Sequence, residues 1–414
     1  MTAAAASQAI AAGDWNWALG RRIGDWAIGL VVFLGAFVIA EPAPYELALA
    51  VVILVWAFLG LKLNRFILPL IVLLFCYAAG GFLALTQLPA PMSELIYVVV
   101  TFFLAISAIF FAAVVAEAPE RRFRVIKNAY IASALFAAIL AIIGYFHLVP
   151  GSEVFLLYGR AKSTFQDPNV FSPFLILPIL LLYRDILTEP LRRSFWKAMI
   201  LLVLLFALFI AFSRAGWGVT VMSGLIVTVL TYVASPRGLP RLRIVVLFGA
   251  GLLVVAMLVA VALTLPQINE IFQDRGTTVL EYYDAGPGGR FSNHLAGFFL
   301  VQEHPLGLGP FVFAGLLGGD EHNMWLKGFT TYGWLGGFAY IALAIWTLVA
   351  ATPLVFRPRP WQGIVQCTYA IFIGHLLIHN VIDNDHWRHV FLIYGLLWGA
   401  IAAEKMTRRQ ERRR

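Results

Sequence analysis

Three side chains have the chemistry to bind a diphosphate and to help a nearby hydroxyl displace it: Arg214, Arg290 and His322. Arginine offers fixed, permanently charged donors that fit phosphate oxygens two at a time. Two unit charges about 4 Å apart interact by roughly 4 kcal/mol at an effective dielectric of about 20, so two arginines would strongly favour a departing phosphate. A neutral histidine can accept the proton of an attacking hydroxyl. These residue types therefore fit group transfer from a diphosphate.

Arg214 lies in the sequence FSRAGWG, a very short hairpin between two apolar runs. So short a connection keeps the guanidinium close to the bilayer surface, the depth at which the diphosphate of a polyprenyl lipid would lie. The alternative is an arginine that extends its charged end to lipid headgroups without binding a substrate. We expect the substrate-binding role, because few basic residues fall on this side of the predicted membrane.

Arg290 follows the glycine-rich turn formed by residues 286–289, with the sequence GPGG. Glycine lets the backbone turn sharply and approach a ligand closely, so we expect Arg290 to be a second phosphate ligand. The alternative is a salt bridge within the loop to Asp284 or Glu281.

His322 and Asn323 lie in the sequence GGDEHNMWLKG, just before an apolar run. We expect His322 to be the general base, with Asp320 or Glu321 orienting its ring. The alternative is a surface histidine that caps the next helix. We expect Asn323 to contact the diphosphate or the glycan.

Arg160 and Lys162 lie in the sequence GRAKSTFQDPNVF, ahead of another apolar run. Both are expected to add positive charge to an anion site. The segment Asp167-Pro168-Asn169 has the pattern of a helix start, with a capping side chain followed by proline in the first turn. We interpret this segment as a cap and not as part of the site.

A second polar cluster, in the sequence HNVIDNDHWRH, contains His379, Asp383, Asp385, His386 and His389. Asp and His at this density could bind a metal. The alternative, which we favour, is a polar turn between two apolar runs. No metal site and no cofactor are therefore predicted.

The apolar runs that must position these residues recur along the whole chain of 414 residues. The chain is 61% hydrophobic and 13% charged, and that charged fraction is about half the usual value for soluble proteins. About twenty residues of helix cross a bilayer core about 30 Å thick. We predict an all-α, polytopic membrane protein that forms a single domain, 1–414. The twelve expected spans are roughly 26–40, 45–61, 66–85, 96–115, 128–146, 170–187, 198–212, 217–233, 244–265, 332–352, 364–382 and 390–403.

One long segment, 266–331, separates two of these spans. Loops of this length in compact folds are usually functional or disordered. This loop contains enough Phe, Leu, Tyr and Trp to pack, so we predict a partly helical, ordered cap.

Basic residues are distributed unevenly between the two sides of the predicted membrane. All but seven of the 30 Lys and Arg residues fall on the side of the two chain ends, and that side is expected to be cytoplasmic. The seven on the outer side are Arg160, Lys162, Arg214, Arg275, Arg290, Lys327 and Arg388. The net charge of +8 is thereby accounted for by membrane topology and lipid contact, and no nucleic-acid partner is expected. The cytoplasmic loops are short and have no GxxxxGK[ST] motif, so we expect chemistry at the outer surface.

Several motifs in the right order resemble the O-antigen ligase superfamily of bacterial membrane glycosyltransferases. His322, Asn323, Gly333 and Gly336 match the histidine motif of that family in spacing. RAKSTFQDPNVF, FSRAGW, GGR and EHPLGLGP are similar to its other landmarks, and the resemblance covers roughly residues 155–345. One position departs: Ser163 stands where the family usually has glycine before Thr-Phe.

The resemblance implies a metal-independent, inverting transfer of a glycan from undecaprenyl diphosphate to an acceptor hydroxyl in the periplasm. It implies that Arg214 and Arg290 hold the diphosphate and that His322 assists the acceptor. The protein would then lie in the bacterial inner membrane, with both termini in the cytoplasm and the active site facing the periplasm.

Three functions fit these features. The single large loop and the His-Asn motif favour an O-antigen ligase, whose acceptor is the lipid A core. A repeat-unit polymerase would use a second lipid-linked glycan as acceptor, and the spacing of Arg275 and Gly286 matches a pattern of such enzymes. A transporter or flippase for lipid-linked glycans, which performs no covalent chemistry, is the alternative from another class.

Overall fold

The computed structural model describes residues 20–413, except residues 41, 267–268, 271–272 and 274–288. Within that part the protein is helical apart from one antiparallel hairpin, which pairs β1 (Leu156–Leu157) with β2 (Arg160–Ala161). A helix over 20–34 comes first. The elements that follow are α2 (Pro44–Phe58), η1 (Arg65–Ile67), α3 (Leu68–Leu85), α4 (Met92–Glu117), α5 (Pro119–Tyr145), η2 (Ser152–Phe155), α6 (Pro168–Thr188), α7 (Leu191–Ile210), α8 (Arg214–Ala234), α9 (Leu239–Ala262), α11 (Arg290–Glu303), α12 (Val312–Leu317), α13 (Met324–Thr330), α14 (Gly333–Val355), α15 (Gln362–Ile378) and α16 (Arg388–Glu411).

Nine helices in the described part are long and apolar enough to cross a membrane. Eight of them are α4, α5, α6, α7, α8, α9, α14 and α16, and the ninth is η1 together with α3. Two shorter apolar helices, α2 and α15, accompany them. The predicted class, an all-helical polytopic membrane protein, is therefore confirmed.

The first predicted span is placed too late, because 26–40 was expected and the helix covers 20–34. After Gly35, backbone groups of this segment form hydrogen bonds with a residue far away in the sequence. The amide of Val38 donates to the carbonyl oxygen of Thr164 at 2.9 Å, and the Thr164 hydroxyl donates to the Ala36 carbonyl at 2.6 Å. This long-range bonding ends the helix although the sequence stays apolar.

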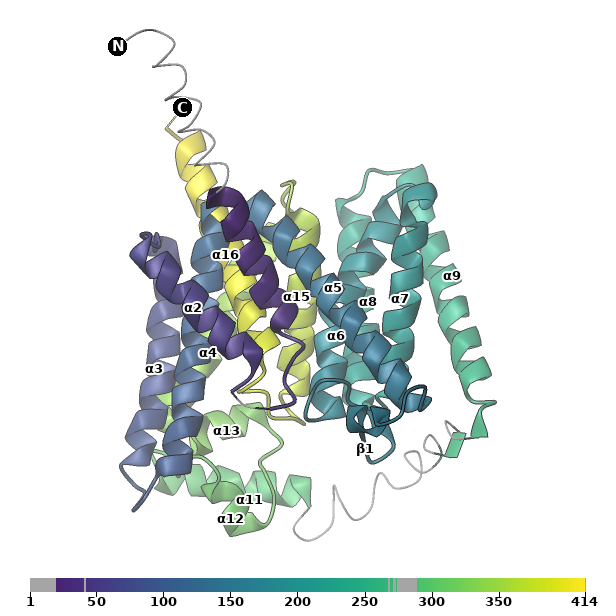
Figure 1. Cartoon of the computed structure of the whole chain (residues 1–414). Coiled ribbons are helices and arrows are strands. Elements are labelled where there is room, and N and C mark those ends of the chain that lie inside the picture. The colour runs from purple at the N-terminus through teal and green to yellow at the C-terminus, as the bar shows by residue number, and fades with distance from the viewer. Residues whose placement is uncertain (1–19, 41, 267–268, 271–272, 274–288, 414) are drawn as a thin grey trace, which may run out of the picture.

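Successive helices run in alternating directions, so their ends form two faces (Figure 1). We call the end that carries α11, α12, α13 and the hairpin the loop face. We call the opposite end, where α16 finishes, the tail face. Contacts between helix ends support this arrangement, since Lys127 of α5, Asp185 of α6 and Lys197 of α7 meet in ion pairs at 2.6 Å.

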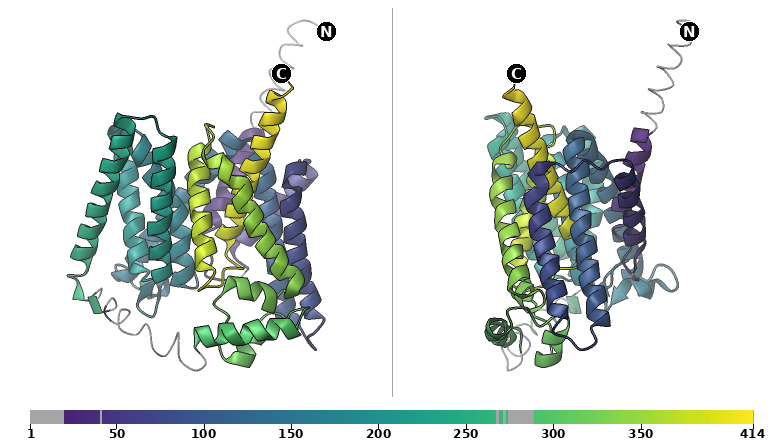
Figure 2. Two further views of the ribbon diagram at one scale, coloured as in Figure 1. Left: turned by 180° about the vertical axis from the view of Figure 1, so that it is seen from behind. Right: turned by 90° about the vertical axis from the view of Figure 1, so that its left-hand side faces the viewer.

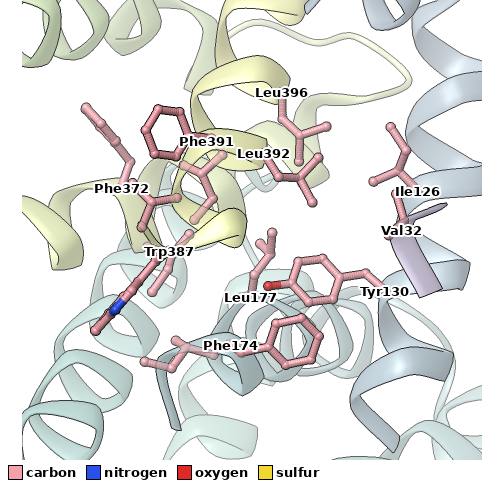
Figure 3. Packing of buried hydrophobic residues seen from close by; sticks show 14 of the residues in the cluster. Val32, Ile126, Tyr130, Phe174, Leu177, Phe372, Trp387, Phe391, Leu392 and Leu396 are labelled. Atoms are coloured by element: carbon pink, nitrogen blue, oxygen red, sulfur yellow. The ribbon is translucent and has the colours of Figure 1, made fainter. Parts of the chain in front are cut away.

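The centre of the bundle is the contact between α4 and α16. A Cβ atom added to Gly395 would lie 2.7 Å from the Cβ of Phe111, and one added to Gly399 would lie 2.6 Å from the Cβ of Val115. Small residues let membrane helices approach closely where lipid offers no hydrophobic drive for association. Aromatic and aliphatic side chains of α5, α6 and α16 fill the adjacent space (Figure 3).

The helix α9 lies at the edge of the bundle in Figure 1 and in the left-hand view of Figure 2. Only 6% of its most apolar window is buried inside the protein. A helix that is hydrophobic all round and leaves its surface uncovered fits contact with lipid. The polar residues of interest lie elsewhere, on the loop face.

Candidate functional site

The His322-Asn323 pair begins helix α13 and is held by a carboxylate from a distant part of the chain. Asp383 accepts hydrogen bonds from the backbone amides of His322 at 3.1 Å and Asn323 at 2.9 Å. The Oδ1 atom of Asn323 accepts from the amide of Leu326 at 3.1 Å and so caps α13. The side-chain oxygen of Asn323 is therefore already hydrogen-bonded within the protein. Its contact with substrate stays a prediction.

His322 has a backbone φ of 46°, in the left-handed region that is uncommon for residues other than glycine. Such a conformation costs on the order of 1–3 kcal/mol and persists when its surroundings hold it. Asp383 does so here through the two amides. His322 is half-buried, its ring makes no hydrogen bond with another described residue, and it interacts electrostatically with Asp383.

The orienting role proposed for Glu321 is wrong in the described structure. Its carboxylate accepts from the Thr330 hydroxyl at 2.6 Å and lies 4.0 Å from the Nζ atom of Lys327. Asp320 is exposed. The backbone of His322 is held by Asp383, which lies 61 positions later in the sequence, and not by the side chain of Glu321.

Lys327 is the centre of this region. Its Nζ atom lies 3.6 Å from Asp383 and 3.8 Å from Asp385, and its side chain is 13% exposed. The Nζ atom also lies 5.7 Å from the centre of the Tyr97 ring. Burial lowers the pKa of Lys327, but the surrounding carboxylates outweigh it, so the net pKa is raised and the side chain stays charged.

The carboxylates around Lys327 differ in their titration. Burial raises the pKa of Glu321 and of Asp383, with the charge of Lys327 opposing the rise in both. Burial acts in the same direction on Asp385, but Lys327 and hydroxyl donors outweigh it and the pKa of Asp385 is lowered. Asp385 is therefore the carboxylate that stays ionised most firmly.

Two tyrosines supply those hydroxyl donors. Asp385 accepts from Tyr97 at 2.6 Å and from Tyr332 at 2.9 Å. The Thr101 hydroxyl lies 2.9 Å from both the Tyr332 hydroxyl and the Nε2 atom of His386, and the His386 ring stacks on Tyr97 with centres 3.8 Å apart. This network joins α4, the start of α14 and the connection between α15 and α16. We call Lys327, its carboxylates and these partners the anchor cluster.

The second polar segment of the sequence, residues 379–389, is partly buried, and its carboxylates contact the start of α13 and Lys327. No group of three or more His, Cys, Asp or Glu side chains in the described part is placed to hold a metal ion. His379 and His389 turn into the protein interior, whereas Asp383 and Asp385 face α13. The interpretation of this segment as a turn was correct in shape but missed that its carboxylates hold α13. The sequence did contain a signal for this role: Asp383 and Asp385 lie between two apolar runs on the same predicted side of the membrane as Lys327.

The motif glycines have a packing reason. Gly333 has a φ of 66°, and a Cβ atom there would lie 2.6 Å from the backbone carbon of Leu306. A Cβ atom on Gly80 of α3 would lie 2.8 Å from the backbone nitrogen of Gly336. The amide of Leu308 donates to the Thr330 carbonyl at 2.6 Å. The EHPLGLGP segment and the histidine motif therefore pack directly against each other.

A second polar group lies around the hairpin, α6 and the α7–α8 turn. Arg160 is 6% exposed; its Nε atom donates to the Ala211 carbonyl at 3.0 Å and its Nη2 atom to Asn169 at 2.9 Å. These bonds satisfy an open carbonyl at the end of α7. Asp167 accepts from the amide of Asn169 at 2.5 Å, so the predicted cap at the start of α6 is confirmed.

Arg214 and Lys162 differ from Arg160 in having no such partners. Arg214 is the first residue of α8 and is exposed, while Lys162 is half-buried. Neither forms an ion pair with an acidic residue that the structure describes. We call Arg214 and Lys162 the open cations.

Ser163, which departs from the family pattern, has a φ of 53°. That backbone region favours glycine. The Ser163 side chain is fully buried, and its hydroxyl donates to the Ala137 carbonyl of α5 at 2.6 Å. A glycine would adopt this backbone conformation easily. At Ser163 the hydrogen bond of the side chain stabilises the same turn.

The remaining predicted residues lie outside the description. The side chain of Arg290 is among them, although its backbone starts α11, and so are Arg275, Glu281, Asp284 and Gly286. Within the described part, no hydrogen bond, ion pair or ring contact joins His322 to Arg214 or Lys162. The two polar groups share the loop face, where α13 and β1 both lie (Figure 1).

Comparisons of the chain with protein-family models and with curated proteins gave no match. The fold and the site thus define a class, a polytopic helical membrane protein with two polar groups on one face. The particular family that its motifs resemble stays a prediction.

Proposed function

We infer that the protein is a membrane glycosyltransferase of the O-antigen ligase type. It would move a glycan from undecaprenyl diphosphate to an acceptor hydroxyl at the loop face. The observation that carries this proposal is the presence, on one face, of two cations that pair with no acidic residue in the described part and of a histidine whose backbone amide is held by Asp383. A group transfer from a phosphate carrier needs both.

The orientation follows from charge. Counting the 20–34 helix, α2 and α15 with the nine long helices gives twelve spans in the proposed topology. Most Lys and Arg residues lie at helix ends on the tail face, which we place in the cytoplasm by the positive-inside rule. The loop face is then periplasmic, and the membrane is the bacterial inner membrane.

In the proposed reaction the acceptor oxygen attacks the anomeric carbon from the side opposite the diphosphate. The bond between that carbon and the phosphate oxygen breaks with inversion, and the electron pair leaves with the diphosphate. Arg214, Lys162 and the predicted ligand Arg290 stabilise the charge of the leaving group. His322 takes the proton of the acceptor hydroxyl. The donor is already activated, so no nucleotide is consumed.

The lipid A core is the acceptor we favour, because a single large loop and the His-Asn motif are typical of the ligases. A repeat-unit polymerase uses the same donor and the same chemistry. The polymerase-like spacing of Arg275 and Gly286 lies outside the described residues. Polymerase activity is therefore one outcome that the test below distinguishes.

The test uses the full chain in lipid nanodiscs with undecaprenyl-diphosphate-linked glycan, with and without lipid A core and without nucleotide. Glycan on the core supports the ligase, and longer lipid-linked glycan without the core supports the polymerase. A parallel reaction with EDTA should retain its turnover. Arg192→Ala, an exposed tail-face change, is the control for Arg214→Ala. Movement of the glycan across a membrane without any new product would overturn the proposal in favour of a flippase.

A further inference from the structure

The tail face contains a cavity of about 280 Å³ where α5, α6 and the start of α15 meet. This is far more than one water molecule needs. Its lining includes four basic residues, Arg124, Lys127, Arg184 and Arg359, and two acidic residues, Glu120 and Asp185. Nothing in the proposed glycosyl transfer uses it, because that reaction takes place at the opposite face.

Arg184 is the basic residue of this cavity whose charge is least compensated. It is half-buried, its Nε atom donates to Gln366 at 3.2 Å, and no acidic residue in the described ranges forms an ion pair with it. A Cβ atom on Gly363 would lie 2.1 Å from the Cζ atom of Arg184. The guanidinium thus lies against the backbone of α15, in a space that exists because residue 363 has no side chain.

The acidic residues near the cavity already have basic partners, and Glu120 pairs with Arg124 at 3.0 Å. Asp185 pairs with both Lys127 and Lys197 at 2.6 Å. Glu404, which pairs with Arg359 at 2.9 Å, also pairs with Arg408 at 3.0 Å. With four basic and two acidic residues in its lining, the cavity keeps an excess of positive charge, and Arg184 forms no ion pair within the described part. An anion would compensate it.

The position of the cavity indicates the kind of anion. Its residues are at helix ends on the tail face, where α6 finishes and α15 begins. Trp361, an amphipathic side chain typical of membrane interfaces, also lines it. Basic pockets between membrane helices at this depth bind anionic lipid headgroups, and a helix start favours phosphate.

We propose that this cavity binds a phosphate-bearing anion through Arg184, with the headgroup of an anionic phospholipid as its source. A free phosphate shares the chemistry, so the two sources must be separated by experiment. The binding should hold the tail-face ends of α5, α6 and α15 together.

The experiment measures binding to the full chain in neutral detergent by native mass spectrometry. The probes are phosphatidylglycerol, phosphatidylcholine and inorganic phosphate. Arg184→Gln should weaken phosphatidylglycerol binding about tenfold, as expected for loss of a charged hydrogen-bonding partner. Arg237→Gln, a change at an exposed arginine of the α8–α9 connection, should leave it unchanged.

Gly363→Ala keeps every charge and should weaken binding by displacing the guanidinium, so the test does not depend on Arg184→Gln folding. Arg184-dependent binding of inorganic phosphate without phosphatidylglycerol would support the phosphate site and assign it to a soluble anion. Equal binding of phosphatidylglycerol and phosphatidylcholine, or equal binding by wild type and both cavity variants, would overturn the proposal. Loss of glycosyl transfer has no bearing on this result.

Discussion

The two polar groups of the loop face use the same residue types in opposite ways. In the anchor cluster, Lys327 is buried among carboxylates, and those carboxylates bind amides and hydroxyls in turn. Among the open cations, Lys162 has no ion pair with a described acidic residue and Arg214 is exposed. Charge with partners fixes the backbone, whereas charge without partners is left to bind a ligand. Under the proposed function, this contrast would let one face hold the backbone at His322 and still bind an anion.

Replacement of His322 is the strongest test of this comparison, because the anchor cluster binds the backbone of residue 322 while the proposed reaction depends on its side chain. His322→Ala should lower transfer by roughly 10²- to 10⁴-fold, the usual contribution of general acid–base catalysis. Thermal stability should fall much less than activity, because the hydrogen bond from the backbone amide of residue 322 to Asp383 remains. His147→Ala, at an exposed histidine of the loop face, is the control. Near-normal turnover of purified His322→Ala would remove the base from the proposal.

Lys327→Met tests the anchor cluster itself. Breaking a buried ion pair from one side costs about 3–5 kcal/mol, because it leaves the partner charges uncompensated. Lys162→Met, a matched change at an open cation, should shift the thermal midpoint little. Adding Asp385→Asn to Lys327→Met should restore part of the loss. Equal midpoints for the two lysine variants would contradict the distinction between the groups.

The pH dependence of that loss has a definite sign. The folded-state pKa of Lys327 is raised above the usual lysine value of 10.5, so its stabilising contribution is complete below that value. It disappears only as the pH rises through the folded pKa. The difference in thermal midpoint between wild type and Lys327→Met should therefore be the same at roughly pH 7 and pH 9.

Arg214 and Arg160 make the corresponding arginine comparison. Arg214→Ala should lower transfer by about 10²- to 10³-fold with normal expression, because it removes charge from the leaving diphosphate. Arg160→Ala should instead lower the thermal midpoint, because it leaves the Ala211 carbonyl without its donor. Arg290→Ala tests the second predicted phosphate ligand in the same assay. Full activity in both Arg214→Ala and Arg290→Ala would refute the diphosphate role.

Asn323→Ala should have the smallest effect. Loss of its cap on α13 costs about 0.5–2 kcal/mol. Asn323→Ser, which can also cap, should recover most of the stability. A large loss of transfer in Asn323→Ser with normal stability would show that the amide contacts substrate as well.

Local sequence patterns were enough to predict several features of this structure. Apolar runs predicted the helices, and the Asp167-Pro168 pair predicted the start of α6. The segregation of Lys and Arg predicted which helix ends lie together. Each of these features depends on residues that are neighbours along the chain, or on the average composition of a segment. Several boundaries were predicted less well. The first helix ends at 34, where the chain bonds to residue 164, while α5 begins at 119 and not at 128, and α16 continues to 411 and not to 403.

By itself, the sequence determined the class of protein, the helical elements and the scarcity of cations on the loop face. Only the tertiary structure decided that Asp383 holds the backbone of His322 and that the Arg160 side chain binds the end of α7. It also decided that Lys327 lies among carboxylates, whereas Lys162 pairs with no acidic residue in the described part. The physical reason is distance along the chain. Periodicity and caps act within a few residues, whereas the partner of a buried charge is chosen by how helices far apart in sequence pack.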